Sequence, residues 1–192
     1  MRHPEETESE VMMKVRIAVG IVAAVLIGSG AVALSEEERG SEGGRPTIAP
    51  VNNPQYAAEC GSCHMAYPPG LLPARSWQKL MGGLADHFGE SAELAPDVAK
   101  ALSDYLTNNA ADHATALRSE RITRTLGPDQ TPLRITQLPF FAREHREVPA
   151  RVSTGNPKVK SMSNCNACHT RAADGSFSER EIRIPGFPNW ED

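Results

Sequence analysis

Two copies of one short pattern constrain this chain more than any other feature of its sequence. The first copy runs from Cys60 to His64 and the second from Cys165 to His169, each with two residues between its cysteines and a histidine directly after the second cysteine. Cysteines at this spacing can form thioethers to the two vinyl groups of a haem, while the histidine becomes an iron ligand. The pattern predicts two covalently bound haem c groups, with His64 and His169 on the iron. The predicted attachment residues are Cys60, Cys63, Cys165 and Cys168.

A four-thiol zinc site is the structural alternative to haem at these cysteines. All four cysteines of the chain belong to the two patterns, so zinc would use all of them and leave both adjacent histidines without a role. The low aromatic content of 5% also favours haem, because an ordinary side-chain core would be thin for a chain of 192 residues. Two haems would supply the missing apolar volume. The length allows one domain or two small ones.

Residues 55–192 are predicted to form a mainly α-helical, small cytochrome c-type domain, packed around two haems and containing long irregular connections. Apolar residues at helical spacing predict a helix over 76–88. Its apolar face consists of Trp77, Leu80, Met81, Leu84 and Phe88. A second helix is expected to begin at Pro96, because proline is favoured at the first helical position. Residues 118–157 are rich in proline and arginine without periodicity, which predicts irregular segments with at most short helices.

The first 54 residues are predicted to lie outside the folded domain. Residues 1–12 form an acidic leader that need not be translated, because a later methionine would serve as the initiator. Residues 13–33 combine a basic start, an apolar run and a small-residue cleavage pattern, which is typical of a secretory signal peptide or, if uncleaved, of a membrane anchor. Residues 34–54 are rich in Glu, Gly and Pro and predict a flexible linker. Either a signal peptide or an anchor would place the body of the protein outside the cytoplasm, in the periplasm.

Each iron needs a second axial ligand, and few histidines lie outside the two patterns. His87 lies on the apolar stripe of the first predicted helix and is the expected ligand, with Met81 on the same face as the rival. Only 23 residues follow His169 and none of them is His or Met, so the ligand of the second haem must lie upstream. His145, which follows two phenylalanines, is favoured over His113. The sequence does not fix which of the two distal histidines serves which haem.

Beyond the two motifs, the chain contains further stretches typical of one protein family. They are Ala66-Tyr-Pro-Pro-Gly-Leu-Leu-Pro, Arg75-Ser-Trp-Gln-Lys-Leu-Met, Asp86-His87-Phe88-Gly89, Phe141-Ala-Arg-Glu-His145-Arg-Glu-Val-Pro and Ile182-Arg-Ile-Pro. With the motifs they span most of residues 55–186, and they resemble the bacterial periplasmic dihaem cytochromes c that donate electrons to an oxygen-binding monohaem cytochrome c. The resemblance implies two low-spin haems, each with two histidine ligands, in a mainly helical periplasmic domain. By position, it implies His87 and His145 as the distal ligands.

Electron transfer is the expected function, because two histidine ligands on each iron leave no open position for a substrate. The protein is therefore predicted not to be an enzyme. A dihaem peroxidase or small reductase is the alternative, as is an electron-transfer subunit of a larger periplasmic reductase. The resemblance implies an oxygen-binding monohaem cytochrome c as redox partner and a membrane electron donor, with no role for nucleic acid. Contact with a membrane is expected only if the apolar N-terminal run is uncleaved.

Charge is distributed unevenly along the chain. Residues 34–117 contain 5 Lys and Arg against 11 Asp and Glu, whereas residues 118–183 contain 12 against 7. If these segments separate in space, the protein is an electrical dipole that can orient a charged partner. The basic surface near His145 is expected to face an acidic patch of the partner, while Arg143 and Arg146 either pair with haem propionates or remain surface charges.

Overall fold

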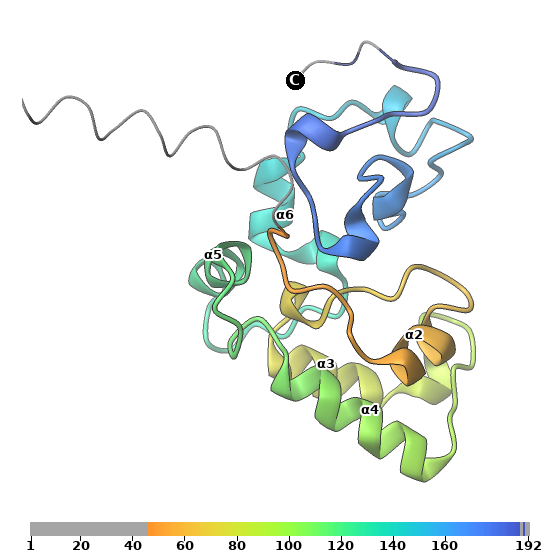
Figure 1. The fold of residues 1–192 in the computed structure, drawn as a ribbon, viewed down its shortest axis with the longest axis vertical. Helices are drawn as coiled ribbons and strands as arrows, with labels where there is room; N and C mark the ends of the chain where they lie inside the picture. Colours follow the sequence, from red (N-terminus) through yellow and green to blue (C-terminus); the bar gives the residue numbers. More distant parts are fainter. Residues whose placement is uncertain (1–45, 189, 191–192) are drawn as a thin grey trace, which may run out of the picture. The chain divides into compact units, whose positions relative to one another are not determined.

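Short helices and isolated β-bridges make up the regular structure of residues 46–188 and 190, the part of the chain that the computed structural model describes. The α-helices, labelled in Figure 1, are α2 (Pro54–Cys60), α3 (Ala74–Met81), α4 (Pro96–Asn108), α5 (Leu117–Thr125) and α6 (Pro139–Glu144). The 3₁₀ turns are η1 (Pro69–Leu71), η2 (Leu84–Asp86), η3 (Ile135–Gln137), η4 (Ala150–Val152), η5 (Cys165–Ala167), η6 (Ala172–Asp174) and η7 (Glu179–Glu181). The mainly helical prediction is confirmed. None of the described helices has both the length and the apolar character needed to span a bilayer.

Helices α3 and α4 pack side by side in the lower part of Figure 1 and bury the apolar side chains of the first half of the domain. Helix α4 begins at Pro96, as predicted, and contributes the fully buried Leu102 and Leu106. Trp77 of α3 is also buried, and its indole N–H donates a hydrogen bond of 2.7 Å to the carbonyl of Pro69. A buried indole needs such a partner, so this bond fixes η1 against α3.

The predicted helix over 76–88 is too long, because α3 ends at Met81. Gly82 and Gly83 follow directly, and two glycines in succession weaken a helix through their backbone freedom. The chain then forms η2 and a tight turn in which His87 and Glu90 make an isolated β-bridge. His87 therefore lies in the turn beyond the helix and not on the apolar stripe of the helix.

The predicted flexible linker over 34–54 is wrong for its described part, because residues from 46 onward pack on the domain. Ile48 is buried, and its backbone N–H donates to the carbonyl of Gly175 at 3.1 Å. Gly175 has a φ of 74°, and a Cβ atom at this position would lie 2.1 Å from the Ile48 carbonyl oxygen. Only glycine fits here. The predicted leader over 1–12 and signal segment over 13–33 lie outside the described residues.

The second half of the domain is held together by short elements, as predicted for residues 118–157. Helices α5 and α6 pack against each other. Ile122 of α5, Phe140 of α6 and Val152 of η4 are buried. The segment after α6 runs through turns to the second cysteine motif, drawn in blue in the upper part of Figure 1.

Candidate functional site

The first cysteine motif starts at the end of α2. The helix begins after Asn53, whose side chain accepts a hydrogen bond of 2.9 Å from the N–H of Tyr56, and Pro54 occupies its first position. Cys60 is the last helical residue and is half-buried, while Cys63 is exposed on the following turn. Burial raises the pKa of the Cys60 thiol, with a smaller contribution from Glu59. One thiol thus lies at the end of α2 and the other on the turn that follows it, so both can face the edge of a flat ligand.

His64 faces His87 across a gap. Their ring centroids lie 6.3 Å apart and their planes differ by 27°. Nδ1 of His64 lies 2.8 Å from the carbonyl of Met65, a bond in which the ring N–H donates. This hydrogen bond assigns the tautomer and leaves Nε2 as the atom with a free lone pair. The His64 ring also stacks on Tyr67, with centroids 4.9 Å apart and planes 30° apart.

A tight turn presents His87. The N–H of His87 donates to the carbonyl of Glu90 at 2.7 Å, and Phe88 adopts a φ of 60°, which is unusual for a bulky residue. The Arg134 guanidinium lies 3.8 Å from the centroid of the Phe88 ring, a cation–π contact that covers this exposed aromatic side chain. Burial lowers the pKa of His87, with smaller contributions from His64 and Arg134. A neutral imidazole is the form that can bind a metal.

The second cysteine motif begins on the 3₁₀ turn η5, whereas the first begins at the end of the α-helix α2. The N–H of His169 donates to the carbonyl of Cys165 at 2.8 Å, and the N–H of Arg183 donates to the carbonyl of Cys168 at 2.9 Å. The C-terminal segment thereby pairs with the motif. Burial raises the pKa of the Cys165 thiol to about 11. The same residue spacing therefore occurs in two backbone conformations.

His169 faces His145, with ring centroids 6.1 Å apart and planes that differ by 78°. His145 follows directly after α6. Its Nδ1 lies 3.0 Å from the carbonyl of Phe141, and the Phe141 ring stacks on its face with centroids 3.9 Å apart. The hydrogen bond holds the edge of the imidazole, and the stacked Phe141 ring holds its face. Burial lowers the pKa of His169 to about 4, with smaller contributions from His145 and Arg118.

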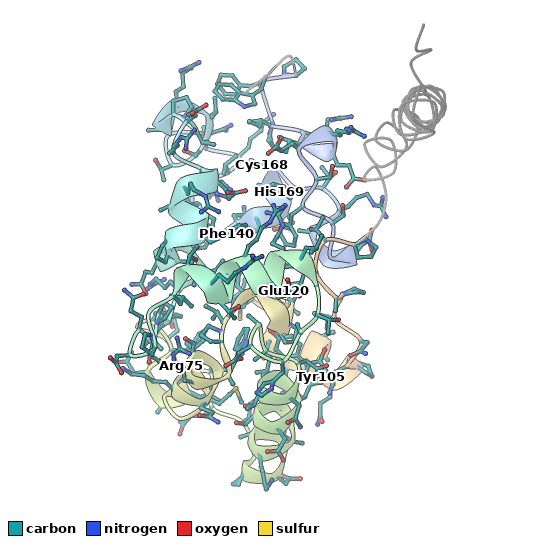
Figure 2. The ribbon with its side chains drawn as sticks, turned by 90° about the vertical axis from the view of Figure 1, so that its left-hand side faces the viewer. Arg75, Tyr105, Glu120, Phe140, Cys168 and His169 are labelled. Atoms are coloured by element: carbon teal, nitrogen blue, oxygen red, sulfur yellow. The ribbon has the colours of Figure 1, made fainter. Side chains whose placement is uncertain are left out.

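An apolar pocket surrounds the second motif and the His145–His169 pair. Phe140, Cys168 and His169, labelled in the upper part of Figure 2, are among its lining residues. The remaining lining is mostly Leu, Ile, Val and Phe side chains from η1, α5, η3, α6, the connection that follows α6 and the C-terminal segment. Nδ1 of His169 is buried and has no hydrogen-bond partner among the residues that the structure describes, whereas most buried polar atoms in proteins have one. Two thiols, two imidazoles and an apolar wall fit a covalently attached haem.

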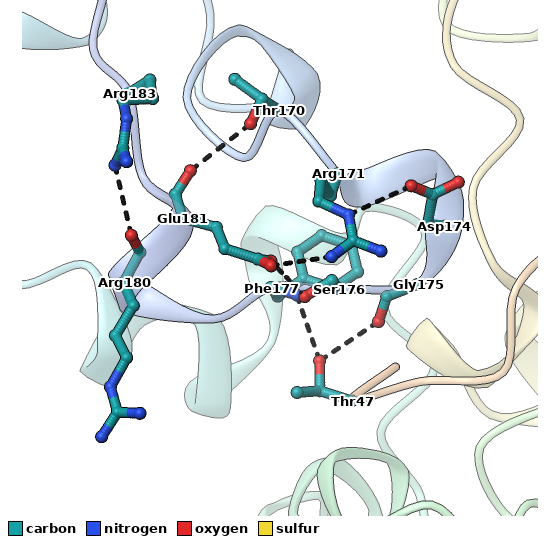
Figure 3. A network of polar contacts seen from close by, with 10 residues as sticks. All are labelled: Thr47, Thr170, Arg171, Asp174, Gly175, Ser176, Phe177, Arg180, Glu181 and Arg183. Carbon is teal, nitrogen blue, oxygen red and sulfur yellow. Dashed lines mark hydrogen bonds and ion pairs between the residues drawn. The ribbon is translucent and has the colours of Figure 1, made fainter. Parts of the chain in front are cut away.

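A polar network fastens the C-terminal segment around this pocket (Figure 3). Arg171 pairs with Asp174 at 3.3 Å and with Glu181 at 2.9 Å, and Ser176 donates to Glu181. The Ser176 hydrogen bond lowers the pKa of Glu181, and Arg171 lowers it further. The neighbouring Phe177 ring lies 5.4 Å from the His169 ring. The network therefore positions a wall of the pocket.

Tyr67 connects the two motifs. Its ring stacks on His64, and its hydroxyl donates a hydrogen bond of 2.7 Å to the carbonyl of Ser163, two residues before Cys165. Burial raises the pKa of Tyr67 to about 12, with a smaller contribution from Cys165, so the phenol stays protonated and keeps donating at neutral pH. Tyr56 donates in turn to the Tyr67 carbonyl at 2.9 Å. Sequence reasoning gave Tyr67 no role, because a contact over 96 residues leaves no local pattern.

The other predicted residues lie elsewhere. Met81 is partly buried against the core, and His113 is exposed in the turn after α4. Arg143 pairs with Glu144 and Arg146 with Glu147, so both take part in exposed ion pairs and neither lines the pocket. Among residues 46–188 and 190, no three His, Cys, Asp or Glu side chains converge as ligands of a metal ion.

The helical fold and the two haem-attachment motifs define a protein of the c-type cytochrome class. Residues 56–177 match the profile of the family described as dihaem cytochrome c, and the chain belongs to this family. Membership establishes two covalently bound haem c groups and haem-based electron transfer. No curated protein sequence matches the chain significantly.

Solved structures of dihaem cytochromes c are similar to this fold. The dihaem cytochrome c from Rhodobacter sphaeroides is 47% identical over 68% of this chain and 100% of its own, with a TM-score of 0.61. The dihaem cytochrome type c from Shewanella baltica OS155 is 42% identical over 71% of this chain and 96% of its own, with a TM-score of 0.59. A second crystal structure from Rhodobacter sphaeroides is 45% identical over 67% of this chain and 99% of its own, with a TM-score of 0.55.

Proposed function

We propose that each haem is held between two histidines, His64 with His87 and His169 with His145. The observation that carries the proposal is the pair of ring separations, 6.3 and 6.1 Å. Two imidazoles that bind one metal from opposite sides, each at a metal–nitrogen distance of about 2 Å, have ring centres roughly 6 Å apart. The spacing supports a direct pairing of each motif histidine with one distal histidine, rather than a crossed arrangement.

The chain's own residues prepare these imidazoles for a metal. Carbonyls of Met65 and Phe141 lie within hydrogen-bond distance of Nδ1 of His64 and His145, which turns Nε2 of both rings toward the site. Burial keeps His87 and His169 neutral. Haem bound in this way supplies a reversible one-electron couple. With an imidazole on both faces of each iron, no position is open to a substrate, so the protein passes electrons and is not an enzyme.

We further propose that the protein works in the periplasm and delivers electrons to a soluble haem protein. The apolar run over 13–33, together with thioether attachment, supports export. The resemblance of the segments between the motifs supports an oxygen-binding monohaem cytochrome c as the acceptor and a membrane protein as the donor. The excess of basic residues over 118–183 supports an acidic patch on the acceptor.

Stopped-flow mixing of the reduced protein with an oxygen-binding monohaem cytochrome c tests this function. We expect rapid electron transfer that slows as salt rises to physiological strength, where the screening length is about 8 Å. Arg146→Glu should slow the reaction further, since the Arg146 side chain is 68% exposed. Lys100→Glu is the matched control on α4, with a side chain that is 77% exposed in the acidic half of the chain. Equal effects of both variants would remove the basic surface from the proposal, and no transfer at any salt would remove this acceptor.

A further inference from the structure

A charged side chain lines the apolar pocket around the second motif. Among the lining residues that belong to the described part of the chain, Arg118 alone is an Asp, Glu, Lys or Arg. The pocket also holds both attachment cysteines and both imidazoles of the second site. The sequence left open whether Arg143 and Arg146 contact haem propionates or remain surface charges, and neither of them lines the pocket.

The register of α5 is what turns Arg118 toward the pocket. Ser119 is buried, and its hydroxyl donates to the carbonyl of Gly70 at 2.9 Å. Ile122, one helical turn after Arg118, is fully buried and lines the pocket with it. Because Ser119 and Ile122 fix the rotation of the helix, the Arg118 side chain emerges at the pocket wall.

The guanidinium of Arg118 contacts an aromatic ring and a backbone carbonyl. It lies 5.6 Å from the centroid of the Phe140 ring, and its Nη2 donates to the carbonyl of Phe177 at 3.4 Å. The Nε atom is buried. The guanidinium thus lies beside the second site rather than in bulk solvent.

We propose that Arg118 binds a propionate carboxylate of the second haem and raises the reduction potential of that haem. The planar guanidinium can donate two parallel hydrogen bonds to one carboxylate, which a lysine cannot reproduce. A fixed positive charge in a poorly solvated wall stabilises the form of the site that carries one more electron. Arg118 is therefore a positioning and charge-setting residue for the second site.

The proposal rests on haem attachment at the second motif and not on the proposed pairing of axial histidines. The two are distinguishable by spin state. A variant of Arg118 that stays low-spin with a shifted potential reports on the charge beside the haem. A variant that turns high-spin reports on the axial ligands instead.

Spectroelectrochemical titration of the holoprotein, combined with resonance Raman spectra of the propionate bending region, tests the proposal. In Arg118→Gln, one of the two couples should fall so that its reduced-to-oxidised ratio at a fixed potential drops about tenfold, which is 59 mV for one electron. The propionate band should shift as well. In Arg118→Lys the potential should be largely retained while the band still shifts, because charge remains and bidentate geometry is lost.

Arg143→Gln is the matched control. Arg143 lies 5.4 Å from the same Phe140 ring but is ion-paired with Glu144 and does not line the pocket. It should leave both couples and the propionate band unchanged. The proposal is overturned if Arg118→Gln moves neither couple, or if Arg143→Gln moves the same couple equally. Should Arg118→Gln fail to retain its haem, an unshifted propionate band in Arg118→Lys would overturn it by itself.

Discussion

The two haem sites share a cysteine motif and a similar distance between two histidine rings, but their surroundings differ. At the first site the imidazoles of His64 and His87 are close to parallel, 27° apart, and Cys63 is exposed. At the second site the imidazoles of His145 and His169 are close to perpendicular, 78° apart, inside an apolar pocket. The motif therefore determines attachment, whereas the surrounding fold determines how the ligand planes are set.

The stacking partners explain the difference in ring planes. At the first site, Tyr67 stacks on His64, which is the histidine of the cysteine motif. At the second site, Phe141 stacks instead on the distal His145, with planes only 15° apart. Parallel imidazoles act on the same iron d orbital, whereas perpendicular imidazoles act on two different ones. We therefore expect the two haems to be electronically inequivalent.

The largest effect that separates the sites should come from removing both attachment cysteines of one motif. Cys165→Ala combined with Cys168→Ala should abolish covalent haem at the second motif and leave the first haem in place, because α2 is capped by Asn53 independently of the pocket. Intact mass should fall by one haem beyond the change in side chains. Loss of both haems would show that the two sites do not mature separately.

The histidine pairing can be tested in this single-haem background. His87→Ala should make the remaining first haem high-spin and able to bind carbon monoxide, since His87 lies 6.3 Å from His64. His145→Ala is the control and should leave that haem low-spin. Absorption spectra with and without carbon monoxide would report both. The opposite result would establish a crossed arrangement, and an effect of Met81→Ala alone would favour methionine ligation.

A smaller effect is expected from the stacking residues. Phe141→Leu removes the ring that lies 3.9 Å from His145, an aromatic contact of about 1 kcal/mol. It should alter the paramagnetic resonance signal of the second haem and leave the first unchanged. Tyr67→Leu should do the reverse. If either variant changed both signals equally, the ring planes would not be set locally.

The smallest effect concerns the hydrogen bond that joins the two sites. Tyr67→Phe keeps the stack on His64 but loses the 2.7 Å bond to the Ser163 carbonyl. Its unfolding free energy should fall by about 1 kcal/mol, measured by chemical denaturation, without a change in either haem signal. Because the pKa of Tyr67 is raised to about 12, its contribution should be present below pH 10 and decline as pH rises toward 12. A variant whose alkaline profile matches the unmodified protein would contradict this role.

Sequence reasoning reached the attachment motifs, the helical class and the start of α4, because each of these depends on local patterns. It extended α3 to Phe88 because the apolar spacing continues past Gly82 and Gly83, whose backbone freedom ends the helix. It left Arg118 unmentioned, since the direction of that side chain depends on the contact of Ser119 with Gly70 across 49 residues. For Arg143 and Arg146 it left open propionate contact or surface charge, and both pair with adjacent glutamates on the surface. What the sequence could not supply was tertiary contact.

Electron paramagnetic resonance of the fully oxidised protein at low temperature tests the central claim most directly. The proposed pair of imidazoles on each iron, nearly parallel at one site and nearly perpendicular at the other, predicts two low-spin signals of equal intensity. The signal of the perpendicular site should be the more anisotropic. A high-spin signal of comparable intensity, or two low-spin signals that superimpose, would contradict the account.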